Sequence, residues 1–169
     1  MTGGPADIDA ADVPALLARA RRMGWRIATA ESCTGGMVAA ALTDIAGSSD
    51  VFDRGFVTYS NAAKQDMLGV RPETLAAHGA VSPEVAMEMA LGAVTHAQAQ
   101  LAVAITGIAG PGGSENKPEG RVCFAIAVGR AGASAHTREF GARGRATVRA
   151  LSTQHALHLL ADTLALNDT

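Results

Sequence analysis

The sequence predicts a three-layer α/β/α sandwich around a mixed, mainly parallel sheet of about five strands. Two short and mostly apolar runs, 25–30 and 101–105, have the length and composition of strands covered on both faces. Each run leads into a turn of glycine and small polar residues, and stretches with helical spacing lie between the strands. With 169 residues, the chain is expected to form a single domain over 1–169, with a frayed end at 1–8.

The amino-acid composition indicates how the core is packed, which class of partner is unfavoured and which cellular compartment is expected. Hydrophobic residues make up 48% of the chain but aromatics only 4%, so small aliphatic side chains must build a closely packed core. The formal net charge is −2 without a basic block, which argues against nucleic acid as a partner. Two cysteines cannot form a disulfide framework, and the first 25 residues lack an apolar segment. These features predict a reduced, cytoplasmic protein without a membrane span.

The first half of the chain supplies three helices and two strands. Apolar residues at helical spacing predict a helix over 9–23, capped by Asp9 or Asp12, and a second over 37–45. The strand 25–30 lies between these helices. The later elements of this half are a tight turn at 47–49, a short strand over 56–59 and a helix from 61 to 68.

In the second half of the chain, helices and strands continue to alternate, and the last two strands are expected to be antiparallel. Ser82 and Pro83 have the residue types preferred at a helix cap and first turn, which predicts a helix to about residue 97. Two strands joined by a glycine-containing turn predict an antiparallel hairpin, which makes the sheet mixed. The elements of this half are helices over 71–79, 82–97 and 144–165, and strands over 101–105, 120–128 and 133–140.

The turn after the first strand, Glu31-Ser-Cys-Thr-Gly-Gly36, has the composition of an anion site. Free N–H groups at the start of the following helix attract negative charge, and Ser32 and Thr34 add hydroxyl donors for ribose or phosphate. Gly35 and Gly36 allow a ligand close to the backbone. The alternative is an ordinary helix start capped by Ser32 or Thr34, and both interpretations stay open.

A second loop of this kind, Thr106-Gly-Ile-Ala-Gly-Pro-Gly-Gly113, follows the strand 101–105. Because parallel strands end at one edge of a sheet, it is expected to lie beside the first loop, with Thr106, Gly107 and Gly110 against a ligand. Arg145 lies four residues before Arg149 on the last helix, and a guanidinium there would clamp a phosphate or face solvent.

The stretch from Gly47 to Lys64 carries the candidate chemistry. Ser49, Tyr59 and Lys64 are expected to meet at one end of the sheet, where amide hydrolysis needs a hydroxyl nucleophile, a desolvated amine and a proton relay. The structural alternative makes them a turn residue, a packing residue and a solvated lysine.

Two other chemistries receive less support. Cys33 near a helix start is a candidate nucleophile for a thiol amidase, although no histidine lies near it in sequence. His155 and His158 are three residues apart on a helix, but no cysteine or carboxylate cluster accompanies them. A metal site is therefore not predicted.

Four motifs together resemble a known family: the two loops above, Gly47-Ser-Ser-Asp-Val-Phe52, and Gly55-Phe-Val-Thr-Tyr-Ser-Asn61 followed by Lys64. In this order they are similar to the motifs of the CinA C-terminal domain family, over about residues 13–164. Stand-alone members of that family are nicotinamide-nucleotide amidohydrolases. The resemblance implies an α/β/α fold and hydrolysis of nicotinamide mononucleotide to nicotinate mononucleotide and ammonia, without a metal or redox cofactor.

The resemblance also implies residue roles. It makes Ser49 the nucleophile, with Ser48 as a competing assignment, Lys64 the base, and Tyr59 the proton relay. It assigns ribose and phosphate binding to residues of the two loops and the last helix: Ser32, Thr34, Gly35, Gly36, Thr106, Gly107, Gly110 and Arg145. Backbone N–H groups of the serine turn would stabilise the oxyanion.

Two further expectations accompany this reading. The alternative function is a noncatalytic nucleotide-binding regulatory module, because the family has also been linked to competence and DNA damage. A homo-oligomer is expected from the small aliphatic faces.

Overall fold

The computed structural model describes residues 8–169, and its centre is a five-stranded sheet with the order β2-β1-β3-β4-β5. β1 pairs in parallel with β2 and β3, whereas β4 and β5 add antiparallel pairs, so the predicted mixed sheet is confirmed. The strands are β1 Ile27–Glu31, β2 Phe52–Val57, β3 Leu101–Gly107, β4 Arg121–Val128 and β5 Ala133–Glu139. Most of the predicted frayed end, 1–8, lies outside the described residues, and Ile8 packs against the core.

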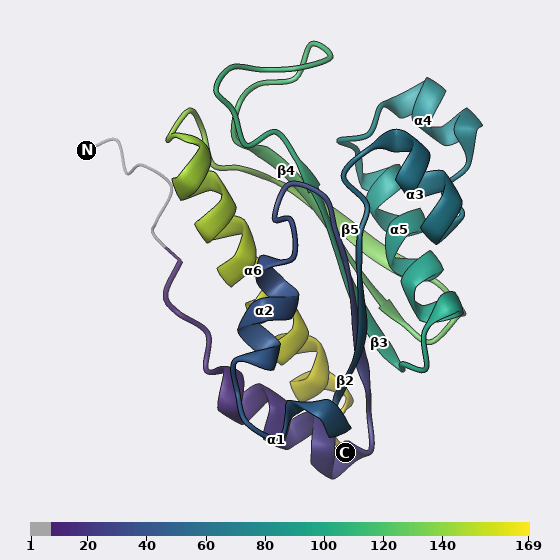
Figure 1. Ribbon diagram of the computed structural model, residues 1–169, viewed down its shortest axis with the longest axis vertical. Helices are drawn as coiled ribbons and strands as arrows, with labels where there is room; N and C mark the ends of the chain where they lie inside the picture. The colour runs from purple at the N-terminus through teal and green to yellow at the C-terminus, as the bar shows by residue number, and fades with distance from the viewer. Residues whose placement is uncertain (1–7) are drawn as a thin grey trace.

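Helices cover both faces of the sheet and complete the predicted three layers (Figure 1). On one face lie α1 Val13–Met23, α2 Met37–Thr43 and α6 Arg145–Asn167. On the other lie α3 Asn61–Leu68, α4 Pro72–His78 and α5 Pro83–His96. The cluster beneath α5 is built largely from alanines, as the low aromatic content predicted. None of the helices within residues 8–169 has the length and apolar character needed to cross a bilayer.

Side-chain caps set the starts of three helices. The Asp12 carboxylate accepts a hydrogen bond from the N–H of Ala15 and begins α1. Ser60 caps α3 in the same way, and Ser82 caps α5 with Pro83 in its first turn, as predicted. The cap at Ser60 places Lys64 one turn into α3.

β2 begins earlier than the sequence predicted, and this difference separates the predicted catalytic residues. A short 3₁₀ turn, Ser48–Asp50, leads directly into β2, so Ser48 and Ser49 precede the strand whereas Lys64 follows it. Six residues of strand span about 20 Å. The expectation that Ser49 meets Tyr59 and Lys64 at one end of the sheet is therefore wrong.

The serine turn is instead attached to α1. The Arg21 guanidinium donates to the Asp50 carboxylate at 2.6 Å and to the Gly47 carbonyl at 3.0 Å. Arg26 donates to the Ser49 carbonyl at 3.4 Å. These contacts fix the turn at the edge of the sheet where the parallel strands begin.

Candidate active site

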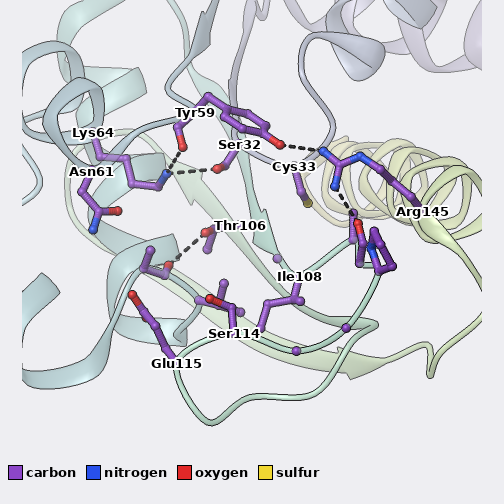
Figure 2. Close-up of a pocket in the computed structure, with 18 residues that line it drawn as sticks. Ser32, Cys33, Tyr59, Asn61, Lys64, Thr106, Ile108, Ser114, Glu115 and Arg145 are labelled. Atoms are coloured by element: carbon purple, nitrogen blue, oxygen red, sulfur yellow. Dashed lines mark hydrogen bonds between the residues drawn. The ribbon is translucent and has the colours of Figure 1, made fainter.

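Three strand ends create the candidate site. In the parallel register, Glu31 of β1 lies opposite Val57 of β2 and Ile105 of β3, so the residues that follow these strands are neighbours. A cavity of about 320 Å³ opens there, at the low end of the volume range typical of ligand sites. Its lining includes Ser32, Cys33, Tyr59, Asn61, Lys64, Thr106, Gly107, Gly110, Ser114, Glu115 and Arg145 (Figure 2).

Lys64 is among the largest fully buried side chains of the described chain, with 1% of its surface exposed. Its Nζ lies 3.0 Å from Ser32 Oγ, 2.8 Å from the Thr58 carbonyl and 3.5 Å from the Tyr59 carbonyl. Burial lowers the Lys64 pKa to about 8, and the charge interaction with the nearby Cys33 sulfur opposes that shift only in part. The site therefore holds an amine that is readily neutral beside a hydroxyl group.

The backbone fixes Ser32 at the exit of β1. Its N–H donates to the Ile105 carbonyl of β3 at 2.9 Å, and its own carbonyl accepts from the N–H of Gly35 at 3.0 Å. Strand, serine and helix follow one another within a few residues, an arrangement that exposes a hydroxyl at the top of the sheet in α/β-hydrolases. From the sequence, Ser32 was expected to bind a ligand or to cap the following helix, and not to act as a nucleophile.

Glu31 explains the shape of the first loop. Its carboxylate is buried and accepts hydrogen bonds from Thr34 Oγ1 at 2.6 Å, the Val38 N–H at 2.9 Å and the Ala39 N–H at 3.0 Å. The carboxylate thus satisfies the free N–H groups at the start of α2. The helix is capped by Glu31 rather than by Ser32 or Thr34.

This cap corrects the predicted anion site. A carboxylate already occupies the N-terminus of α2, and Thr34 is fully buried with its hydroxyl donated to Glu31. Gly35 and Gly36 have φ values of +57° and +103°, which serve the turn, and neither lines the cavity. Phosphate binding at Thr34, Gly35 and Gly36 is therefore not supported.

The Glu31 cap leads to a stability prediction. In Glu31→Gln an amide NH₂ replaces one acceptor oxygen, leaving a donor unsatisfied, so the free energy of unfolding should fall by about 1–3 kcal/mol. Urea denaturation measures this change. Glu73→Gln is the matched control, because the Glu73 side chain is 73% exposed and pairs only loosely with Arg71 at 3.8 Å. Equal stability of the two variants would contradict the buried cap.

Cys33 lines the cavity but is poorly suited to nucleophilic attack. Burial raises the pKa of its thiol to about 12, which disfavours the thiolate. Its carbonyl accepts a hydrogen bond from Arg149 Nε at 3.0 Å, which holds the loop against α6. The predicted alternative of a thiol amidase loses its chemical basis.

Cys33→Ala is accordingly expected to keep turnover within about threefold of the wild type, because the side chain contributes packing rather than chemistry. Steady-state ammonia release measures this, with iodoacetamide-treated wild type as a chemical comparison. A loss as large as that of a Ser32 variant would restore the thiol hypothesis.

Tyr59 and Arg145 form one side of the cavity. Arg145 donates to Tyr59 Oη at 2.6 Å and to the Gly110 carbonyl at 2.8 Å, which joins α6 to the loops after β2 and β3. Figure 2 shows the phenol directed toward Arg145, whereas it is the Tyr59 carbonyl that approaches Lys64. The predicted relay from the Tyr59 hydroxyl to the reacting atoms is not formed in this structure.

The second glycine-rich loop lines the cavity as expected. Thr106, Gly107 and Gly110 all contribute to the lining. Thr106 Oγ1 donates to the Ala80 carbonyl at 2.9 Å, and a Cβ on Gly107 would lie 2.7 Å from a Val122 methyl group. Glycine at 107 is therefore required by the close approach of β4.

Several lining residues were not predicted from the sequence. Asn61 lies one turn before Lys64 on α3, and that i, i+3 spacing was the available signal for a shared face. Ser114 and Glu115 come from the long β3–β4 loop, which has no periodic pattern. Within residues 8–169 no cluster of three or more potential metal ligands is present. His155 instead contacts His136, and His158 contacts the Asp9 carbonyl.

The fold and the cavity define an α/β protein with a pocket at the carboxyl end of its parallel strands, the place where α/β sheets bind ligands. The sequence profile described as "CinA C-terminal domain" matches residues 11–164, and the chain belongs to that family. The predicted family and fold are confirmed.

Individual relatives agree with this assignment. Nicotinamide-nucleotide amidohydrolase PncC of Escherichia coli (strain K12) is 58% identical over 138 residues, which cover 81% of this chain and 83% of that protein. A CinA-like protein of Mycolicibacterium paratuberculosis is 56% identical over 141 residues, but the match covers only 32% of its length. The crystal structure of competence/damage inducible protein CihA from Agrobacterium tumefaciens superposes with a TM-score of 0.87 at 46% identity, covering 98% of this chain and 99% of that one.

Proposed function

We propose that this chain hydrolyses the carboxamide of nicotinamide mononucleotide, giving nicotinate mononucleotide and ammonia. The observation that carries the proposal is the 3.0 Å contact between Lys64 Nζ and Ser32 Oγ inside the cavity. The similarity to the E. coli amidohydrolase supports the choice of substrate. Ser32 replaces Ser49 as the proposed nucleophile, because Ser48 and Ser49 precede β2 and so lie at the opposite end of the strands from the cavity.

The contacts of Lys64 suit a general base. A neutral amine has two hydrogens, and the Thr58 and Tyr59 carbonyls accept them at 2.8 and 3.5 Å. Its lone pair then faces the Ser32 hydroxyl and accepts that proton as Oγ attacks the carboxamide carbon. Collapse of the tetrahedral adduct breaks the C–N bond, and the Lys64 ammonium returns the proton to the leaving ammonia.

Hydrolysis of the resulting ester completes the cycle. Lys64 removes a proton from a water molecule that attacks the ester carbon, and Ser32 leaves with that proton as its hydroxyl is restored. The N–H of Cys33, which directly follows the nucleophile, is the proposed donor to the oxyanion in both steps. Because burial lowers the Lys64 pKa to about 8, a fraction of the amine is neutral at pH 7 and can act as the base.

The charged wall of the cavity accommodates the phosphate. Arg145 is a cation that lines the pocket on the side opposite Lys64, and it is held by Tyr59 and by the Gly110 carbonyl. We assign the phosphate to Arg145 and the glycine loop, with Thr106 and Gly107 beside the ring and ribose. Tyr59 serves as a contact surface for the substrate and a holder of Arg145, rather than as a proton relay.

Arg145→Leu is expected to reduce the preference for the mononucleotide over nicotinamide riboside about tenfold, because the charge-assisted bond to phosphate is lost. The ratio of kcat/KM values for the two substrates measures this. Arg130→Leu is a matched control, since Arg130 is exposed on the β4–β5 turn, outside the cavity lining, and donates to the Thr95 carbonyl at 3.4 Å. An unchanged ratio would remove Arg145 from phosphate binding.

The test of the proposed function is ammonia release from nicotinamide mononucleotide by purified protein in the presence of a chelator. Stoichiometric nicotinate mononucleotide and ammonia would support the amidohydrolase. Binding of the mononucleotide without release would favour the noncatalytic regulatory module.

The homo-oligomer remains a prediction, for which light scattering during size-exclusion chromatography is the measurement.

A further inference from the structure

One carboxylate of the cavity has no part in the chemistry described above. Glu115 is the only acidic residue among the described residues that line the cavity, where Lys64 and Arg145 are the cations. Figure 2 shows its side chain rising from the β3–β4 loop, on the wall remote from Arg145 and toward Asn61. A carboxylate would repel the substrate's phosphate, so it must face a different part of the ligand.

The backbone at Glu115 is held in an unfavourable conformation. Ser114 and Lys117 exchange two backbone hydrogen bonds of 3.0 and 2.8 Å, and the two residues between them, Glu115 and Asn116, have φ values of +52° and +64°. Left-handed backbone is disfavoured for residues other than glycine, by about 1–2 kcal/mol for each residue. Glycine would relieve this cost at 115, yet the chain places a long acidic side chain there.

The turn is fastened to the connection between α4 and α5. Lys117 Nζ donates to the carbonyls of His78 and Val81, both at 2.6 Å, and Lys117 itself does not line the cavity. A Cβ on Gly79 would lie 2.6 Å from Glu115 Oε2, so the absence of a side chain at 79 makes room for the carboxylate. Lys117 thus fastens the turn that carries Glu115, and Gly79 leaves room for the Glu115 carboxylate beside the cavity.

We propose that Glu115 determines specificity by accepting hydrogen bonds from the ribose hydroxyl groups of the substrate. A carboxylate only accepts hydrogen bonds, and vicinal ribose hydroxyls are the donors that such a group recognises in nucleotide sites. The carboxamide is committed to Ser32 and the phosphate to Arg145, so the hydroxyl groups of the ribose beside Thr106 and Gly107 are the donors left for the third wall. The inference rests on the proposed function, because it takes a pyridine ribonucleotide as the ligand.

A double-mutant cycle between protein and ligand tests this contact. Calorimetry measures binding of nicotinamide mononucleotide and its 2′-deoxy analogue to Ser32→Ala protein, with and without Glu115→Ala. Loss of the 2′-hydroxyl should weaken binding about tenfold when Glu115 is present and less than about twofold when it is absent. Glu73→Ala is the control for loss of an exposed acid, and it should leave the tenfold effect intact.

The binding measurements distinguish failure of the Glu115 role from failure of the amidohydrolase proposal. Equal effects of the 2′-hydroxyl with and without Glu115 would overturn the specificity role while leaving the amidohydrolase proposal untouched. Binding of neither nucleotide by Ser32→Ala protein would overturn both proposals. Gly79→Ala should also reduce the discrimination between the mononucleotide and its 2′-deoxy analogue, because the new methyl group would displace the Glu115 carboxylate. Gly69→Ala is the matched control. Gly69 has a similar φ of +68°, but no atom lies within 4 Å of a Cβ at that position, so the discrimination should not change. Unchanged discrimination in Gly79→Ala would contradict the positioning argument.

Discussion

Replacing Ser32 with alanine is expected to lower kcat for nicotinamide mononucleotide by at least about 1000-fold, whereas Ser49→Ala should leave kcat within about twofold. The Ser32 hydroxyl lies 3.0 Å from the buried Lys64 amine, and no other serine hydroxyl contacts that amine within the described chain. Ser49 lies before β2 and contacts Arg26 through its carbonyl, so its side chain is remote from the reaction. Steady-state ammonia release by the two purified variants measures the difference.

The comparison carries its own control for folding. Both substitutions remove one hydroxyl oxygen, so thermal denaturation of the two variants shows whether either loses structure. Ser48→Ala extends the comparison to the neighbouring serine of the same turn. Full activity in Ser32→Ala together with loss of activity in Ser49→Ala or Ser48→Ala would show that the nucleophile is a serine of the 48–49 turn.

Lys64→Met is expected to lower kcat by about 1000-fold, because the substitution keeps the apolar length of the side chain and removes the base. In the wild type, burial lowers the Lys64 pKa to about 8, and only the neutral amine accepts the serine proton. The value of kcat/KM should therefore rise with pH, about tenfold for each unit below 8, and level off above it. The pH dependence of ammonia release measures this limb.

Lys64→Arg separates charge from basicity. A guanidinium keeps the positive charge but does not deprotonate in proteins, so this variant should stay inactive across the whole pH range. A wild-type profile that is flat through pH 8, or that falls as pH rises, would show that neutral Lys64 is not the active form.

The sequence predicted most of the fold because its strongest patterns are local. The runs that became β1 and β3 are apolar enough to identify buried strands, and Ser82 and Pro83 identify the start of α5. Parallel pairing then places the loops after β1 and β3 at one edge, as expected. These inferences need only residue composition and spacing.

β2 was misplaced because it is an edge strand with a mixed sequence. Asp53, Arg54 and Gly55 interrupt its apolar pattern, and three of its six positions are partly buried while three are exposed. Because the predicted strand began too late in the sequence, Ser49 was expected at the same end of the sheet as Lys64. The rule that ligands bind at the carboxyl ends of strands would have selected Ser32, which directly follows β1.

Other features of the site depend on contacts that no local pattern contains. Arg145 and Tyr59 are separated by 86 positions, and Lys117 reaches the connection between α4 and α5 from 36 and 39 positions away. The Glu31 cap is different, because its partners Val38 and Ala39 are only seven and eight residues along the chain. A buried acid before a glycine-rich helix start was a usable signal for that cap.

The most direct test of the Ser32–Lys64 site is the location of the covalent ester formed with nicotinamide mononucleotide. Acid-quenched protein is digested with trypsin, and the peptide 27–54 is fragmented in a mass spectrometer, because it contains Ser32, Cys33, Ser48 and Ser49 together. We expect a nicotinate mononucleotide adduct on Ser32 that is absent from Lys64→Met protein. An adduct on Cys33 or on either serine of the 48–49 turn would contradict it.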